Sequence, residues 1–372
     1  MASRGSIPKM MELAGIDMLP PEAGIPMIRR ELTAGGTRGE VVIAQRLGVL
    51  LKDWDEAGGL NPKFESPLPP GPVASRISSV SVHDGCTIEA TLDPTAQPFL
   101  HDHQIGGTPV LPGVMGIEAF GEAAVSLLPG WHVQSIQDIH FMAPFKFYRN
   151  EARALKIETQ IHSDHEEVLA DCRLIGERVL PNQPEPQVTI HFAGQVRLGK
   201  RERETANVHP DLGQVFAAVD ASDIYRLYFH GPAYQVIEKA WSNGKQVIGL
   251  FAQNLPPNHS PEELGTVVDP RLIELCFQTA GLWEMGSQGR MGLPHSIREV
   301  QIARPQSEAA SRLYAVVTPD ATGCSFDAEV VDAQGHLYLR VIGYKTITIN
   351  DSIDPERLRC LQEIFAHSPV AA

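Results

Sequence analysis

Long hydrophobic runs are missing from this sequence of 372 residues. No run approaches the roughly 18 to 20 apolar residues that cross a bilayer, and the first residues, MASRGSIPKMMEL, lack the apolar core of a secretory signal. These absences predict a cytoplasmic protein without a membrane segment. Basic residues are also few, because 31 Lys and Arg face 45 Asp and Glu, which gives a net charge of −14. A nucleic-acid partner is therefore not expected, since phosphate binding needs clustered cations.

Cysteine is scarce and shows no pattern. No CxxC pair occurs, and an odd number of widely spaced cysteines predicts neither a disulfide framework nor a thiolate zinc site. We therefore expect reduced thiols, most of them buried, at Cys86, Cys172, Cys276, Cys324 and Cys360.

A Gly- and Pro-rich stretch, residues 55–73, divides the chain. Upstream, residues 1–72 hold one strand candidate, Glu40 to Ala44, and too few apolar positions for a core of their own. Downstream, residues 73–198 and 207–350 each show a short strand, one long helix and then antiparallel strands. The polar stretch GKRERETANV connects the two units. This repetition predicts an α+β fold in which each unit wraps a sheet around a single helix.

The helices have recognisable start signals. One is predicted over about 112–128, and the other begins in DPRLIELCFQ, with Asp269 as the N-cap and Pro270 at the first helical position. We interpret residues 351–372 as a C-terminal tail or linker. That tail has an amphipathic helical pattern formed by Leu358, Leu361, Ile364 and Phe365.

The stretch HDHQIGGTPVLPGVMGIEAF places a histidine ahead of a Gly/Pro turn and a helix start. Gly106 and Gly107 permit a sharp turn, and Pro112 suits the first turn of a helix. The free amides of that first turn, Gly113 among them, can polarise a thioester carbonyl while a neutral His103 removes the proton α to it. We expect the positive helix end to lower the imidazole pKa and keep His103 a base near neutral pH.

Two other interpretations of this histidine stay open. An isolated histidine is most often a surface side chain or one whose hydrogen bonds are satisfied in the core. His101 and His103 could instead share a metal, because alternate residues of a strand point to the same face. No HxxxH or carboxylate cluster completes such a site, so no metal is predicted.

The second helix supplies a candidate acid. Glu274 and Gln278 are four residues apart and share a helical face. Apolar neighbours on both sides of Glu274 predict a poorly solvated carboxyl with a raised pKa and a proton to donate. A base at His103 and an acid at Glu274 are what the elimination of water requires, and Gln278 can hold the carboxyl in position. The alternative is an ordinary glutamate on a helix surface.

Three motifs, taken in order, resemble those of a known family. HQIGGTPVLP is similar to the HxxxGxxxxP motif of polyketide synthase dehydratase domains, HGPAYQ to their YGPxFQ motif, and DPRLIELCFQ to their HPxxxDxxxQ motif. The resemblance covers about residues 73–350. It implies a double hot dog, in which two antiparallel sheets each wrap around one long helix. It also implies dehydration of a 3-hydroxyacyl thioester, carried on the phosphopantetheine of an acyl carrier protein, to the 2-enoyl thioester, with no other cofactor.

The sequence departs from this family at several motif positions. Glu274 replaces the usual Asp and adds one methylene of reach, and Asp269 replaces the usual His. His230 and Tyr234 replace the Tyr and Phe of the middle motif. Because the family places aromatic residues there, we expect both side chains to line the substrate tunnel without transferring protons. These departures make the chain more similar to polyunsaturated-fatty-acid or enediyne-like iterative synthases.

A second, vestigial site is conceivable. PGVMGIEAF resembles the stand-alone dehydratases of fatty acid synthesis, whose acidic residue falls at Glu118. Glu118 follows His103 by fifteen positions, and Glu274 follows His259 by the same interval. The segment after His259, SPEELGTVVDP, lacks a Gly/Gly turn, so we expect only the site of His103 and Glu274 to work.

The segment RRELTAGGTRGEVVIA is similar to the end of a synthase ketoreductase domain, although it lacks the Gly-rich nucleotide turn and the catalytic Ser/Tyr/Lys region. We therefore interpret residues 1–72 as the remnant of a ketoreductase and the chain as part of a megasynthase. The implied partners are the carrier protein and the neighbouring domains, and a homodimer stays open. Two alternatives also stay open, namely a hot-dog acyl thioesterase and a catalytically silent scaffold.

Overall fold

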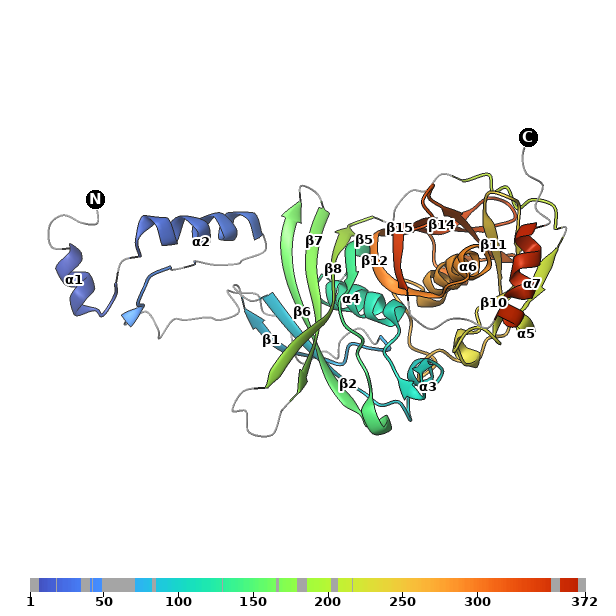
Figure 1. Ribbon diagram of the computed structural model, residues 1–372. Helices are drawn as coiled ribbons and strands as arrows, with labels where there is room; N and C mark the ends of the chain where they lie inside the picture. Colours follow the sequence, from blue (N-terminus) through green and yellow to red (C-terminus); the bar gives the residue numbers. More distant parts are fainter. Residues whose placement is uncertain are drawn as a thin grey trace.

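The computed structural model describes residues 7–17, 19–34, 41, 43–48, 71–81, 85–128, 130–164, 167–178, 186–201, 207–215, 217–348 and 355–366. Two N-terminal helices, α1 (Ile7–Leu13) and α2 (Pro21–Ala34), lie to one side of the main body (Figure 1). The strand predicted over 40–44 is wrong for the positions described, since Val41, Ile43 and Ala44 belong to no strand. Residues 55–70 of the predicted linker and 202–206 of the predicted connector lie outside the described residues.

The main body is built on one antiparallel sheet of thirteen strands. The first half contains, in spatial order, β1 (Arg76–Ser81), β2 (Gly85–Leu92), β6 (Arg153–Asp164), β7 (Glu167–Arg178), β8 (Gln187–Gly199) and β5 (His132–Phe141). The second half continues with β12 (Gly292–Ile302), β15 (Leu337–Thr348), β14 (Ser325–Asp332), β13 (Leu313–Pro319), β11 (Val247–Phe251), β10 (Ile237–Ser242) and β9 (Ala218–Asp220).

The two halves join edge to edge. Strands β5 and β12 pair antiparallel, with Ile139 opposite Ile297 and His140 opposite Ser296. Both isoleucines are buried, so the junction belongs to the core. The predicted double hot dog is confirmed, with the difference that its two sheets continue into each other through this pair.

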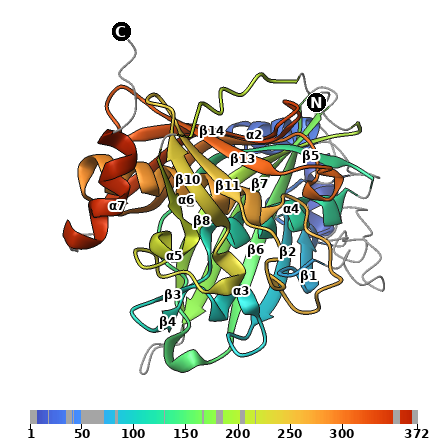
Figure 2. The same ribbon diagram turned by 90° about the vertical axis from the view of Figure 1, so that its right-hand side faces the viewer.

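Each half wraps around one long helix, α4 (Gly113–Leu127) in the first and α6 (Pro270–Gln288) in the second (Figure 2). Helix α4 is buried from Val114 to Ala124 and packs against β5 and β8. Gly116 makes this close packing possible, because a Cβ there would lie 2.2 Å from the ring of Phe192. The predicted start of the helix is corrected by one residue, since Pro112 is the N-cap.

Smaller elements complete the fold. The amphipathic C-terminal helix is confirmed as α7 (Pro355–Ala366), which packs against α6 and buries Leu358, Leu361 and Ile364. The remaining short elements are α3 (Pro98–His101), β3 (Gln104–Ile105), β4 (Thr108–Pro109), η2 (Tyr148–Asn150), α5 (Ala221–Ile224), η3 (Pro232–Tyr234) and η4 (Gln306–Glu308). All five cysteines are free, and three of them are buried. Among the described helices, none is long and apolar enough to cross a membrane.

Candidate active site

A tight hairpin presents His103. Strands β3 and β4 are joined by Gly106 and Gly107, whose φ angles are +58° and +76°. Two successive positive φ angles are what a two-residue type I′ turn requires, and glycine adopts them without strain. The hairpin folds the chain back so that the amide of Val110 donates to the carbonyl of His103 at 3.0 Å. The predicted Gly/Gly turn is thus confirmed.

The same hairpin orients the imidazole of His103. Its Nδ1 lies 2.8 Å from the carbonyl oxygen of Val110. A carbonyl only accepts, so Nδ1 must carry the proton and Nε2 of the neutral ring keeps its lone pair. Burial and the nearby His230 lower the pKa of His103 to about 4. The predicted lowering is confirmed, with burial and the second histidine as its causes, whereas a contribution of the helix end stays a prediction.

His230 lies beside His103. Their backbones form a β-bridge and their ring centroids are 5.4 Å apart. Asp102 fixes this juxtaposition, because its carbonyl accepts from the amide of Gly231 at 2.7 Å and its carboxylate accepts from the amide of Ala233 at 2.7 Å. The sequence reasoning missed Asp102. The only available signal was an acidic residue immediately before the first motif.

Glu274 reaches the same place from α6. Its buried carboxylate uses Oε1 for two contacts, with His230 Nε2 at 3.2 Å and with the Nε2 of Gln278, which donates at 2.8 Å. Burial pushes the pKa of Glu274 upward, but the hydrogen bond and charge of His230, together with His103 and Gln278, outweigh it and leave the pKa below its usual value. The predicted raised pKa is therefore wrong.

Gln278 holds the carboxyl as predicted and is itself held by tyrosines. Its amide also donates to the carbonyl of Tyr234 at 2.8 Å, and its Oε1 accepts from the hydroxyl of Tyr225 at 2.9 Å. The hydroxyl of Tyr228 donates to the backbone carbonyl of Gln278 at 2.6 Å. The sequence reasoning missed both Tyr225 and Tyr228, although they lie just ahead of HGPAYQ. These contacts fix the rotamer of Gln278 and, through it, the carboxyl of Glu274.

His103 and Glu274 line one cavity of about 560 Å³. Gly113, His230 and Gln278 also line it, whereas Gly107 and Pro112 lie outside its wall. Tyr234 does not line it either, and its side chain is fully buried. The expectation that Tyr234 lines the cavity is thus wrong, since η3 turns the ring into the core, whereas the expectation that it transfers no proton stays a prediction. Most of the wall is apolar, with contributions from Leu111, Phe141, Phe192, Phe277, Met291 and Leu293.

Gly113 brings a backbone amide to the cavity wall. It is the first residue of α4, where an N–H has no partner inside the helix. A Cβ at this position would lie 2.8 Å from the ring of Phe141, so only glycine fits between the ring and the cavity. A carbonyl oxygen bound in the cavity can therefore approach a free donor at a positive helix end.

Glu118 and His259 lie elsewhere. The carboxylate of Glu118 accepts from the amides of Val267 at 2.7 Å and Val268 at 3.0 Å, and burial raises its pKa to about 7. His259 Nε2 lies 2.8 Å from the carbonyl of Leu264. Neither residue lines the cavity. Both side chains are engaged with the segment that leads into α6.

The structure also bears on two further expectations, the N-cap at Asp269 and a metal shared by His101 and His103. Asp269 is the N-cap of α6, but its side chain makes no cap bond and instead accepts from the amide of Gln306 at 2.8 Å. The side chain of His101 is 73% exposed and contacts Asp102, so it does not converge with His103. The described residues contain no group of three or more His, Cys, Asp or Glu that could hold a metal.

Two family models match the chain. Residues 73–168 match the polyketide synthase dehydratase domain, and residues 205–356 match the polyketide synthase dehydratase N-terminal domain. A polyunsaturated fatty acid synthase protein from Thraustochytrium sp. is 24% identical over 226 residues, which are 59% of this chain and 8% of that protein. The pikromycin polyketide synthase component PikAII of Streptomyces venezuelae is 24% identical over 220 residues, 56% of this chain and 6% of that protein. The chain thus spans a small fraction of these relatives.

Solved structures show the same fold. A dehydratase domain from the CurF module of curacin polyketide synthase has a TM-score of 0.61 at 17% identity, covering 76% of this chain and 100% of that one. A trans-AT polyketide synthase dehydratase domain from Brevibacillus brevis has a TM-score of 0.62 at 19% identity, with the same coverage. The fold and the cavity thus define a double hot dog dehydratase, a hydro-lyase that removes water from hydroxyacyl intermediates. The two family models together match more than half of the chain, which belongs to the polyketide synthase dehydratase family.

Proposed function

We propose that this domain dehydrates a 3-hydroxyacyl thioester on an acyl carrier protein to the 2-enoyl thioester, with His103 as base and Glu274 as acid. One observation carries the assignment. A neutral imidazole from the first half and a buried carboxyl from the second half line one apolar cavity. The cavity suits an acyl chain, and its polar groups gather where a β-elimination needs a base and an acid.

The base acts through Nε2 of His103, which takes the proton α to the thioester carbonyl. Negative charge then develops on the carbonyl oxygen, where the amide of Gly113 can stabilise it. The C3–oxygen bond breaks as the hydroxyl receives a proton and leaves as water. The proton that His103 has accepted returns to the site through solvent after the products leave.

The departing hydroxyl takes its proton from a pair of residues. An ionised Glu274 alone has no proton to give, and its pKa lies below the usual value because of His230. The Nε2 of His230 faces Oε1 of that carboxylate at 3.2 Å, so the two groups can share a single proton. We assign to His230 the role of supplying this proton to the carboxyl, which replaces the expectation that it takes no part in proton transfer.

Steady-state dehydration of one 3-hydroxyacyl pantetheine thioester tests these roles. His103→Ala and Glu274→Gln should each lower kcat by about 10²- to 10⁴-fold, the range for one acid–base group. Glu118→Gln and His259→Ala, each checked for folding, serve as matched controls outside the cavity. An equal loss in Glu118→Gln would show that the acid has been misplaced. Free acid as the product would favour a thioesterase, and a substrate analogue that fails to bind would favour a silent scaffold.

The surroundings of the domain are part of the proposal. We interpret residues 1–72 as the end of a ketoreductase domain on the sequence resemblance alone, and a cytoplasmic megasynthase as the whole. The relatives are large synthases of which the chain spans only a few per cent, which supports neighbouring synthase domains as partners.

A further inference from the structure

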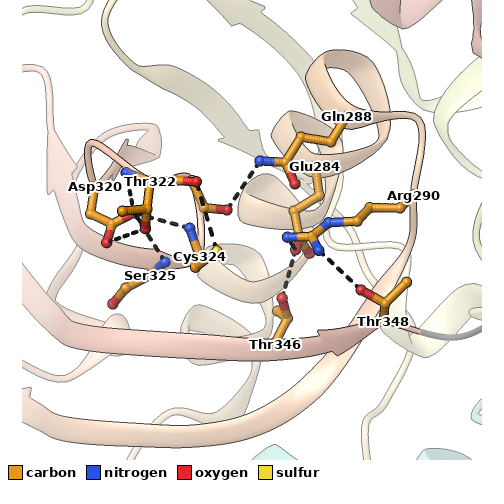
Figure 3. A network of polar contacts seen from close by, with 10 residues as sticks. Glu284, Gln288, Arg290, Asp320, Thr322, Cys324, Ser325, Thr346 and Thr348 are labelled. Carbon is orange, nitrogen blue, oxygen red and sulfur yellow. Dashed lines mark hydrogen bonds and ion pairs between the residues drawn. The ribbon is translucent and has the colours of Figure 1, made fainter.

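A second carboxyl lies in the cavity, away from the reacting groups. Glu284 is ten residues after Glu274 on α6, and its side chain is fully buried although it lines the cavity. Its Oε1 accepts from the hydroxyl of Thr346 at 2.6 Å and faces Arg290 at 3.5 Å (Figure 3). Its Oε2 has no partner in the part of the chain that the structure describes. The proposed dehydration uses none of these groups.

The contacts of Glu284 are more than a link between α6 and β15 requires. Such a link is complete through Oε1, whereas a buried acceptor without a donor is costly. Gly292 leaves the space for Oε2, since a Cβ there would lie 2.6 Å from this oxygen. The wall beside it is apolar, with Met291, Leu293 and Ile347. This part of the cavity wall therefore holds one carboxyl oxygen that has no donor among the described residues, on a side chain that is fully buried.

The position of Glu284 sets its distance from the chemistry. Ten helical residues at about 1.5 Å per residue place it about 15 Å along α6 from Glu274. Phe277 and Gly281 line the cavity between the two, and the hydroxyl of Tyr228 lies over Gly281. Because His103 and Glu284 line the same cavity, a thioester held at His103 can extend past these side chains toward Glu284.

The charges select the kind of group that fits. Oε2 accepts a hydrogen bond, which favours a donor and disfavours a carboxylate or phosphate. Arg290, at 3.5 Å from Oε1, already supplies a cation and disfavours a second one. A neutral donor such as a hydroxyl or an amide N–H meets both conditions.

We propose that Glu284, positioned by Thr346 and Arg290 and about 15 Å along α6 from Glu274, is a binding subsite for a neutral hydrogen-bond donor on the bound thioester. The inference rests on the proposed dehydration. Two parts of such a substrate offer this chemistry, a hydroxyl far along the acyl chain and the amides and hydroxyl of the pantetheine arm. The substrate class is therefore a 3-hydroxyacyl thioester with a second polar group that reaches Glu284 while the 3-hydroxyl lies at Glu274.

Four thioesters separate the two sources. A long 3-hydroxyacyl chain with or without a distal hydroxyl is joined to either pantetheine or N-acetylcysteamine, and kcat/KM is measured for the wild type, Glu284→Gln and Glu284→Leu. The preference is the ratio of kcat/KM with the distal hydroxyl to kcat/KM without it. If the acyl hydroxyl binds Glu284, this ratio should fall about 10- to 100-fold in Glu284→Leu, which is the effect of losing a hydrogen bond to a charged group. If the pantetheine arm binds, the preference for pantetheine should fall by that amount instead.

Glu329→Gln is the matched control, because Glu329 also pairs with an arginine, Arg340 at 2.6 Å, but lies outside the cavity. It should change neither preference. An equal loss on all four substrates in folded Glu284→Gln, or no change in either preference, would overturn the subsite. Absence of enoyl product from the wild type with every substrate would instead contradict the proposed dehydration, so the two failures are distinguishable.

Discussion

The fit between Glu274 and His230 can be tested by removing one methylene. In Glu274→Asp the carboxyl retracts by up to about 1.5 Å, the length of one C–C bond. Its contacts with His230 at 3.2 Å and Gln278 at 2.8 Å would then exceed hydrogen-bonding distance. A misplacement of about 1 Å can cost roughly 100-fold in rate, so we expect kcat to fall by about that factor. This loss is expected even though Asp is the usual residue of the polyketide motif.

The same motif offers a compensating change. It combines its Asp with a Tyr at the position of His230, and a phenol oxygen reaches farther from the backbone than an imidazole nitrogen. The double variant Glu274→Asp/His230→Tyr should therefore recover at least about tenfold of the lost kcat, a coupling typical of contacting residues. Enoyl formation is followed at steady state, with Glu329→Asp as the control for shortening a glutamate elsewhere. If the single Asp variant keeps nearly full activity, or the double variant is no better than it, the reasoning is refuted.

Three further predictions concern the base, the buried tyrosine and the N-terminal segment. Burial and His230 lower the pKa of His103 to about 4, so the base stays unprotonated above that pH. We therefore expect kcat/KM to decline only as the pH falls toward 4, and a decline centred near pH 6.5 would contradict this. Tyr234→Phe should keep most activity and its melting temperature, since the buried hydroxyl has only the side chain of Asn258 beside it and makes no hydrogen bond of normal length among the described residues; a loss like that of His103→Ala would reveal a chemical role. A chain beginning near Pro72 should fold and dehydrate thioesters, because it keeps the amide of Val73, which contacts Glu122 at 3.2 Å; an inactive but folded truncation would disprove it.

The sequence predicted those parts of the site that depend on local geometry. The Gly/Gly turn, the start of α6 at Pro270 and the pairing of Gln278 with Glu274 each involve residues within a few positions of one another, where turn and helix rules apply directly. The base and the candidate acid could therefore be named from the motifs and their order. The repeated pattern of one helix and several strands was enough to predict the fold class.

The remainder depends on contacts between distant segments. His230 and Glu274 are far apart in the chain, and apolar helix neighbours gave no sign that a histidine would offset the burial of the carboxyl. The same reason explains why Asp102 was missed, since its carboxylate binds a turn that only the fold brings near. The ring of Tyr234 points to the core because η3 sets its direction, which motif spacing alone does not specify.

The pairing of β5 with β12 has a consequence for how the domain holds together in solution. A strand edge presents unpaired amides and carbonyls that another strand can bind, and long exposed edges promote aggregation. In the described sheet the two halves cover each other's longest open edge, which leaves only the short strands β1 and β9 at the borders. Either half expressed alone would expose that edge over about ten residues, as the length of β5 indicates. We therefore expect an isolated half to self-associate through it, so that each half acts as the other's protection against misassembly.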